Sequence, residues 1–222
     1  ATSTLDLSVS GGELADTIGI AGIYAASSAE IVSDGVELTA TGNLSMAASS
    51  TVMAAASTGA GTSTDDDSDN AIAVTIVDSD AAAFISGDSV VSVAGTVEIS
   101  ATNNVLSSTV ADASGGSETS AGAVLALAVI GQTTSAYIAA TTSTTINGAD
   151  SITVAALSNS TSTTTAKSSP GGASESTGGT NTEAQLSRTD AGTSEGSIGV
   201  AAAVAITDIT SNTRAYISTD PW

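Results

Sequence analysis

A seven-residue pattern of alternating apolar and polar residues recurs along the chain and limits the possible folds more than any other feature. Its four copies are Thr4–Ser10, Gly35–Thr41, Thr96–Thr102 and Ser151–Leu157. Successive side chains of a β-strand point to opposite faces, so the alternation predicts strands with one buried face. We expect Leu5, Leu7 and Val9 on that face in the first copy. A motif that returns in successive units indicates a repeat architecture.

A second recurring element lies between the copies of this pattern. It consists of an Ala-Val segment followed by an Ala-aromatic-Ile segment, as in Ala73–Asp78 with Ala83–Ile85, Ala126–Ile130 with Ala136–Ile138, and Ala203–Asp208 with Ala215–Ile217. We interpret each pair of segments as two strands joined by a polar turn, with Asp78 and Asp208 as equivalent turn residues. Segments 57–70, 112–122 and 167–197 are rich in Gly, Ser, Thr and acidic residues, which predicts loops.

These repeats predict an all-β fold, a parallel β-helix (β-solenoid) with long Gly/Ser/Thr/Asp-rich loop insertions. One unit cannot bury its apolar face alone, whereas stacked units bury a continuous core. A single repetitive domain would then cover the chain, with a partial unit at 1–17, units at about 18–70, 71–122 and 123–197, and a partial unit at 198–222. The alternative is a tandem pair of β-sandwich domains, but strands within a sandwich have no reason to repeat a motif in register.

Asn43, Asn104 and Asn159 each follow a copy of the first pattern at the same distance. Asn bonds readily to the local backbone, so we expect these residues at a recurring turn. If successive units stack, their side-chain amides could also bond to one another, although two coils in each unit would hold them too far apart. Asn43 and Asn159 also begin glycosylation sequons. Because Asn104 does not, the repeated position favours the turn.

The net charge of −20 excludes several partners. There are 23 acidic residues against Lys167, Arg188 and Arg214. Nucleic acids and anionic membranes attract proteins through Lys and Arg, so neither is an expected partner. The most apolar stretches, 121–130 and 198–206, are shorter than the roughly 20 residues of a membrane-spanning helix, so no membrane insertion is expected.

The chain contains no His and no Cys, so the nucleophile systems that depend on them are excluded. We expect no enzymatic activity. Asp65, Asp66, Asp67 and Asp69 offer hard oxygen ligands of the kind that Ca²⁺ prefers, although a solvated acidic loop is the simpler interpretation.

A second candidate for cation binding is a column of like charges. In the first three copies of the pattern, Asp6, Glu37 and Glu98 occupy the polar face. Like charges that stack in successive strands repel unless a cation or water screens them.

The two ends of the chain suggest assembly. If Ala1 of one copy followed Trp222 of another, Thr4 would come ten residues after Tyr216. The spacings from Phe84 to Thr96 and from Tyr137 to Ser151 are similar, 12 and 14 residues. This predicts head-to-tail stacking, either of separate subunits into a filament or of tandem segments, although a fragment cut from a longer array would leave the same ends. The residues expected at the joint are Thr4, Leu5, Leu7, Val9, Tyr216 and Ile217.

The succession Ala-Val-x-Ile-x-Asp, Ala-Tyr-Ile and Val-x-Ile-x-Ala followed by a Ser/Thr-rich loop resembles the repeats of giant bacterial surface and secreted proteins, the filamentous-haemagglutinin-like and leukotoxin-like adhesins. The resemblance implies a β-helix displayed outside the cell, without catalytic residues. We therefore expect a structural or adhesive module at the cell surface, with itself and a host or neighbouring cell as partners. The alternative is a calcium-dependent module that binds glycans or proteins.

Overall fold

The computed structural model describes residues 1–13, 18–59, 70–113, 122–139, 144–168 and 201–218. About nine-tenths of them lie in β-strands and none in a helix, which confirms the all-β prediction. The strands are β1 (Thr2–Ser10), β2 (Gly12–Glu13), β3 (Ile18–Asp34), β4 (Glu37–Ala40), β5 (Leu44–Gly59), β6 (Asn70–Ser86), β7 (Val90–Val93), β8 (Thr96–Ala113), β9 (Gly122–Ala139), β10 (Thr145–Asn147), β11 (Ser151–Ser168) and β12 (Ala201–Ser218).

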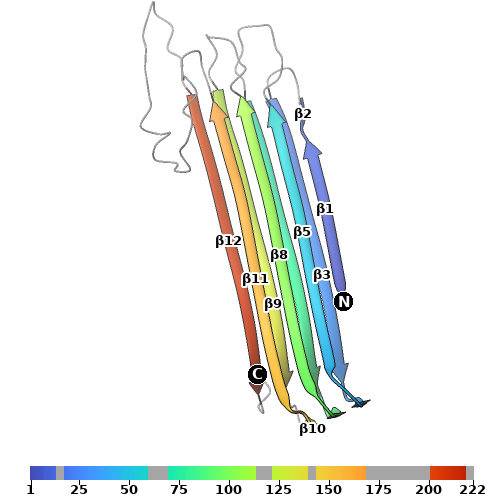
Figure 1. Cartoon of the computed structure of the whole chain (residues 1–222). Helices are drawn as coiled ribbons and strands as arrows, with labels where there is room; N and C mark the ends of the chain where they lie inside the picture. The colour runs from blue at the N-terminus through green and yellow to red at the C-terminus, as the bar shows by residue number, and fades with distance from the viewer. Residues whose placement is uncertain (14–17, 60–69, 114–121, 140–143, 169–200, 219–222) are drawn as a thin grey trace, which may run out of the picture.

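The strands form three sheets, two long and one short. Sheet A has the order β1-β5-β8-β11, sheet B the order β12-β9-β6-β3-β2, and the short sheet C the order β10-β7-β4. Figure 1 shows the long strands running nearly side by side along the molecule, with β10 at its lower end. All pairs are parallel except β2 with β3. Parallel pairing does not match the antiparallel sheets of Ig-like sandwiches.

In the parallel pairs, each residue pairs with one that lies 47 to 79 residues further along the chain. Thr4 pairs with Thr51, Glu37 with Val90, and Gly122 with Ala201. Three successive stretches of the chain, β3–β5, β6–β8 and β9–β11, thus each contribute one strand to each sheet, in the order B, C, A.

The predicted register is right for the last two copies of the first pattern and wrong for the first two. Thr96–Thr102 and Ser151–Leu157 pair residue for residue between β8 and β11. Thr4–Ser10 instead lies beside Thr51–Ser57, and Gly35–Thr41 leads into and forms the short strand β4 of sheet C. Both errors have the same cause, since alternation looks alike in any strand of matching phase.

The predicted turn within the second element is also wrong. Residues 73–85 belong to the single 17-residue strand β6, and 126–138 to the 18-residue β9. Asp78 lies within β6 and pairs with Gly131 of β9, whereas Asp208 of β12 pairs with Val129 of β9. The two acids therefore occupy different rows of sheet B and are not equivalent. The alternation is simply unbroken from one segment to the next. Of the predicted loops, 57–59, 70, 112–113, 122 and 167–168 lie in strands, and the remainder falls outside the described residues.

The interior follows the predicted alternation. In β8 the inward residues Val97, Ile99 and Ala101 are buried, and in β1 Leu5, Leu7 and Val9 face the same way but are half-buried. At the lower end, Ile85, Val91 and Val97 pack in one apolar cluster between the sheets. Small residues allow the sheets to lie close together along the rest of their length.

A line of buried polar groups crosses this interior near its middle. Ser50 Oγ lies 3.0 Å from Ser27 Oγ and 2.9 Å from Ser79 Oγ, and Ser79 donates to Asn103 Oδ1 at 2.7 Å. The Asn103 amide donates in turn to the Ser79 carbonyl oxygen at 2.6 Å. Buried polar groups are costly unless hydrogen-bonded, so these contacts fix how sheets A and B align.

Glycines make the turns at the lower end. Gly35 follows β3 with φ of 60°, and Gly87 follows β6 with φ of 67°. A side chain disfavours this left-handed conformation, so glycine is suited to the turn into sheet C.

Candidate functional site: the edges of the sheets

Each end of the stack of strands is an edge. β1, β3 and β4, with β2 beside part of β3, form what we call the N-terminal edge, and β10, β11 and β12 form the C-terminal edge. The backbone N–H and C=O groups on the outer side of an edge strand can pair with a further strand. The edges are therefore the part of the described chain best suited to bind another β-structure.

Inward apolar side chains become exposed at the C-terminal edge. Ile85, Ile138 and Ile217 occupy one inward row on β6, β9 and β12. Their exposed fractions are 0%, 5% and 61%. The backbone position is the same in all three strands, so the difference arises because no described strand follows β12. A further strand paired with β12 would cover Ile217, just as β9 covers Ile85 on β6 and β12 covers Ile138 on β9.

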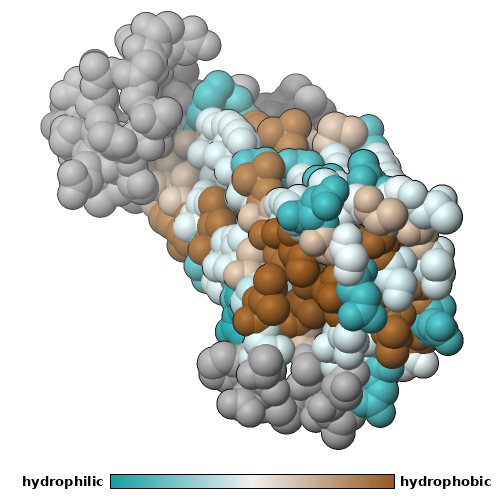
Figure 2. Space-filling view, turned by 60° about the horizontal axis from the view of Figure 1, so that its bottom comes forward, coloured by the Kyte–Doolittle hydropathy of each residue, from teal (hydrophilic) through white to brown (hydrophobic). Residues whose placement is uncertain are grey.

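Apolar residues gather at the lower end of the molecule. Figure 2, which turns this end toward the viewer, shows them between more polar regions. Exposed apolar side chains in or next to the strands there are Val36, Val90, Ile152 and Ile217. Patches of this kind on a folded chain indicate contact surfaces.

An aromatic ladder crosses the outer face of sheet B. The rings of Phe84 and Tyr137 stack at 4.5 Å, and those of Tyr137 and Tyr216 at 5.0 Å. Burial raises the pKa of Tyr137 above its ordinary value, and the nearby Tyr216, Glu30 and Asp34 raise it further by charge repulsion with the ionised form. The Ala-aromatic-Ile repeats predict this alignment, because Ala136-Tyr137-Ile138 pairs residue for residue with Ala215-Tyr216-Ile217.

The three asparagines are not equivalent. Asn43 lies in the connection between β4 and β5, where its Oδ1 accepts from the Thr96 N–H at 2.9 Å. Asn104 and Asn159 lie within β8 and β11, where a turn was the wrong expectation. Their stacking is nevertheless confirmed, because Asn159 Nδ2 donates to Asn104 Oδ1 at 2.9 Å.

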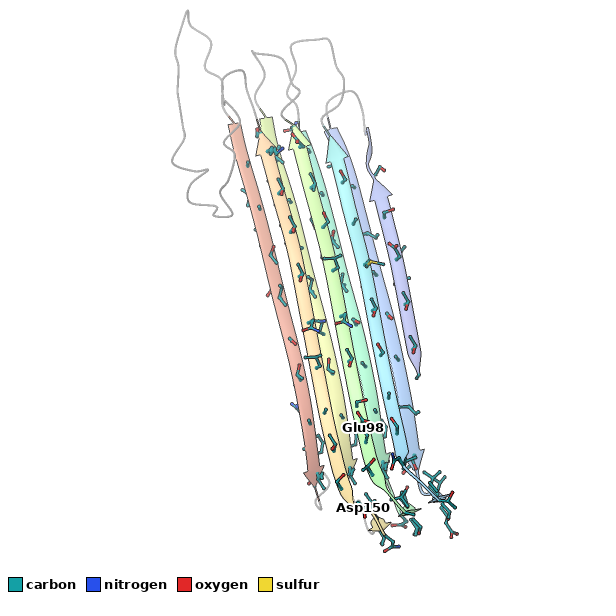
Figure 3. The ribbon with its side chains drawn as sticks, in the orientation of Figure 1. Glu98 and Asp150 are labelled. Carbon is teal, nitrogen blue, oxygen red and sulfur yellow. The ribbon has the colours of Figure 1, made fainter. Side chains whose placement is uncertain are left out.

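The predicted calcium ligands Asp65, Asp66, Asp67 and Asp69 lie outside the described residues. Within the part of the chain that the structure describes, no three acidic residues gather to hold a metal ion. Figure 3 labels Glu98 and Asp150, which lie at different heights toward the lower end.

The predicted acidic column is wrong. Asp6 pairs with Met53, Glu37 with Val90, and Glu98 with Thr153, so no two of these acids are neighbours. Their exposure to solvent is as expected.

The predicted joint residues lie on the two edges, but the spacing used to join them is wrong. Thr4, Leu5, Leu7 and Val9 are on β1, and Tyr216 and Ile217 are on β12. Through Thr51, Thr4 is equivalent to Asn104 and Asn159, which follow Phe84 and Tyr137 by 20 and 22 residues. A direct link from Trp222 to Ala1, which gives ten residues, is therefore about half the length of the connections inside the chain.

Sequence reasoning missed the buried Asn103, although a signal was present. Asn103 falls in phase with the inward Val97, Ile99 and Ala101, which places it inside. Its neighbour Asn104 points outward for the same reason.

Comparisons with protein-family models, curated proteins and solved structures find no match to this chain. Among the described residues, no helix has the length and hydrophobicity that crossing a membrane requires.

Proposed function

We propose that the chain is a structural and adhesive module of an extracellular fibre or giant cell-surface protein, built as a parallel β-solenoid that stacks head-to-tail. The observation that carries this proposal is the parallel register, which repeats from β3 through β6 and β9 to β12 and brings similar residues together. Phe84, Tyr137 and Tyr216 form one such row. Stacked repeats of this kind extend along one axis and leave pairing surfaces at both ends.

The outer face of sheet B supports an adhesive role. Its upper rows are apolar, with Ile20, Ile72, Leu125 and Val204 aligned across four strands. Ile20 and Val204, together with Tyr24 on β3, are exposed. An apolar surface on a chain with a net charge of −20 is a candidate contact for a host or neighbouring cell.

Electron microscopy with X-ray diffraction from aligned samples tests the structural role. We expect rods and a strong axial reflection near 4.8 Å, the spacing between paired strands. Isolated compact particles without that axial reflection would contradict the proposal.

A second function, calcium-dependent recognition of glycans or proteins, is proposed from the sequence alone. The run Asp65-Asp66-Asp67 with Asp69 directly precedes β6, which begins at Asn70. Calcium bound there would raise the melting temperature by mass action. Melting curves with and without Ca²⁺ should then differ, and the difference should vanish when these four residues are replaced by Asn. Superimposable curves for the unchanged chain would remove this candidate.

A further inference from the structure

The two edges differ in charge. On the N-terminal edge, β1, β3 and β4 contain no Lys or Arg, and their acidic residues are Asp6, Glu30, Asp34 and Glu37. On the C-terminal edge, the strands β10, β11 and β12 carry Lys167 and Arg214 with one acid, Asp208, while Asp150 lies between β10 and β11. Lys167 already pairs with Asp112 on β8 at 3.3 Å, so Arg214 is the cation that can face a further strand. Both basic side chains of the described ranges thus lie on the C-terminal edge. Complementary charges favour contact between unlike edges over contact between like ones.

The register of sheet B tells which residues would meet. Along one row, Glu30 on β3 is followed by Ala82, Ser135 and Arg214 on the next three strands. If β3 of a second copy continued the sheet beyond β12 in this register, its Glu30 would lie directly opposite Arg214. Both side chains are exposed and point to the outer face. Within its own strand, Arg214 Nε donates to Asn212 Oδ1 at 3.1 Å.

Neighbouring rows fit the same arrangement. Val32 occupies the same row of sheet B as Phe84, Tyr137 and Tyr216. Val32 of the second copy would therefore pack on the Tyr216 ring at the end of the aromatic ladder. Ser33 of that copy would lie beside Ile217 and cover part of its exposed side chain. In sheet A, Thr4 on β1 would lie opposite Asn159 on β11.

We propose that two copies of this chain associate head-to-tail, with β12 of one copy pairing in parallel with β3 of the next and Arg214 facing Glu30. This inference rests on the proposed structural function and names its partner and register. β2 covers β3 at Gly19 and Ile20, so the new pairing runs over Ala21–Asp34, opposite Ala205–Ser218.

The parts of this contact have different roles. Backbone hydrogen bonds between the strands and burial of Ile217 and Tyr216 supply most of the affinity. An ion pair between exposed side chains adds little to stability, but like charges brought face to face are strongly unfavourable. The pair therefore selects the register. A slip by one residue would turn every side chain to the opposite face, and a slip by two would place Arg214 beside Ser28 or Val32.

Charge reversal in the full chain tests the inference by sedimentation velocity over a range of protein concentrations at low salt. The variants are Glu30→Arg, Arg214→Glu and the two combined, with Glu98→Arg as a matched control, since Glu98 is exposed on the internal strand β8. We expect each single reversal at the edge to weaken association by roughly tenfold or more and the combination to restore it. The control should associate like the unchanged chain. Circular dichroism of each variant verifies that it is folded.

Two results would overturn the inference, and they separate it from the proposed function. If the unchanged chain associates and neither edge reversal alters this, the register is wrong while the structural function stands. If the unchanged chain stays monomeric and gives no 4.8 Å axial reflection, both fail.

Discussion

The N-terminal and C-terminal edges end the same stack of strands, yet they differ inside as well as outside. One inward row of sheet A begins with Leu7 at the N-terminal edge, continues through Ala54 and Ser107, and ends with Ser162 at the C-terminal edge. Leu7 packs against an apolar cluster that contains Ala54 and Val52. The Ser107 and Ser162 hydroxyls are buried with no hydrogen-bond partner among the described protein atoms.

This difference teaches that the backbone register, rather than a uniform core, holds the repeats together. The strands keep pairing residue for residue while the interior changes from leucine to serine. The hydrogen bonds between paired strands join backbone groups, so the register persists while the inward side chains change in size and polarity. The two edges thus share one backbone register and differ in the side chains that they carry, including the charged ones.

The largest expected effect is the difference in lost stability between a substitution on an internal strand and one on an edge strand. Ile85→Ala removes a fully buried side chain and should lower the free energy of unfolding by about 2–5 kcal/mol. Ile217→Ala, in the same row, should cost less than about 1 kcal/mol in the monomer because its side chain is 61% exposed. Urea denaturation at low protein concentration measures both. Equal losses would mean that Ile217 is already covered.

The next effect compares the interiors of the two edges, and the two substitutions should act in opposite directions. Leu7→Ser places a polar group against the apolar cluster and should destabilise the chain by about 1–2 kcal/mol. Ser162→Ala removes a buried hydroxyl without a described partner and should stabilise it by up to about 1 kcal/mol. Thermal and urea unfolding test both. A destabilised Ser162→Ala variant would mean that this hydroxyl is hydrogen-bonded in solution.

The smallest effect concerns alkaline pH and the ladder next to the C-terminal edge. The raised pKa of Tyr137 means that the unfolded chain releases this proton at a lower pH than the folded chain. The contribution of the protonated Tyr137 to the free energy of unfolding is fully retained below the ordinary tyrosine pKa of about 10. It is lost as the pH rises through the pKa of Tyr137 in the folded chain. Tyr137→Phe should therefore lose less stability between pH 8 and 11 than the unchanged chain. Identical losses would show that the tyrosine hydroxyl is not perturbed.

Sequence alone predicts which segments form strands and which way their side chains face, but not where a long strand continues without a turn or which strands are neighbours. The alternation in Val97-Glu98-Ile99 is sufficient to place Val97 and Ile99 inside, because it depends only on the backbone geometry of one strand. Register depends on distant parts of the chain. Thr4–Ser10 resembles Thr96–Thr102 in its letters, yet it pairs beside Thr51–Ser57.

The candidate site was predictable to a similar degree. The repeated Ala-Tyr-Ile indicates that Tyr137 and Tyr216 align, and they do. The contact between Glu30 and Arg214 that we propose could not be inferred from the sequence, since it follows only when the four strands of sheet B are placed in order. Neither residue belongs to a recurring motif.

Head-to-tail pairing in this register is tested most directly by disulfide cross-linking, because the chain contains no cysteine of its own. Glu30→Cys and Arg214→Cys in one chain would place two thiols on adjacent parallel strands of neighbouring copies, about 4.8 Å apart at the backbone, which suits a disulfide. Within one copy they are three strands apart and cannot join. Glu30→Cys with Asn212→Cys, shifted by two residues, is the matched control.

Mild oxidation of the first variant should give a ladder of covalent dimers and higher multimers on a non-reducing gel, which reducing agent abolishes, while the control gives little. Equal cross-linking of both variants, or none in either, would contradict the register that the account requires.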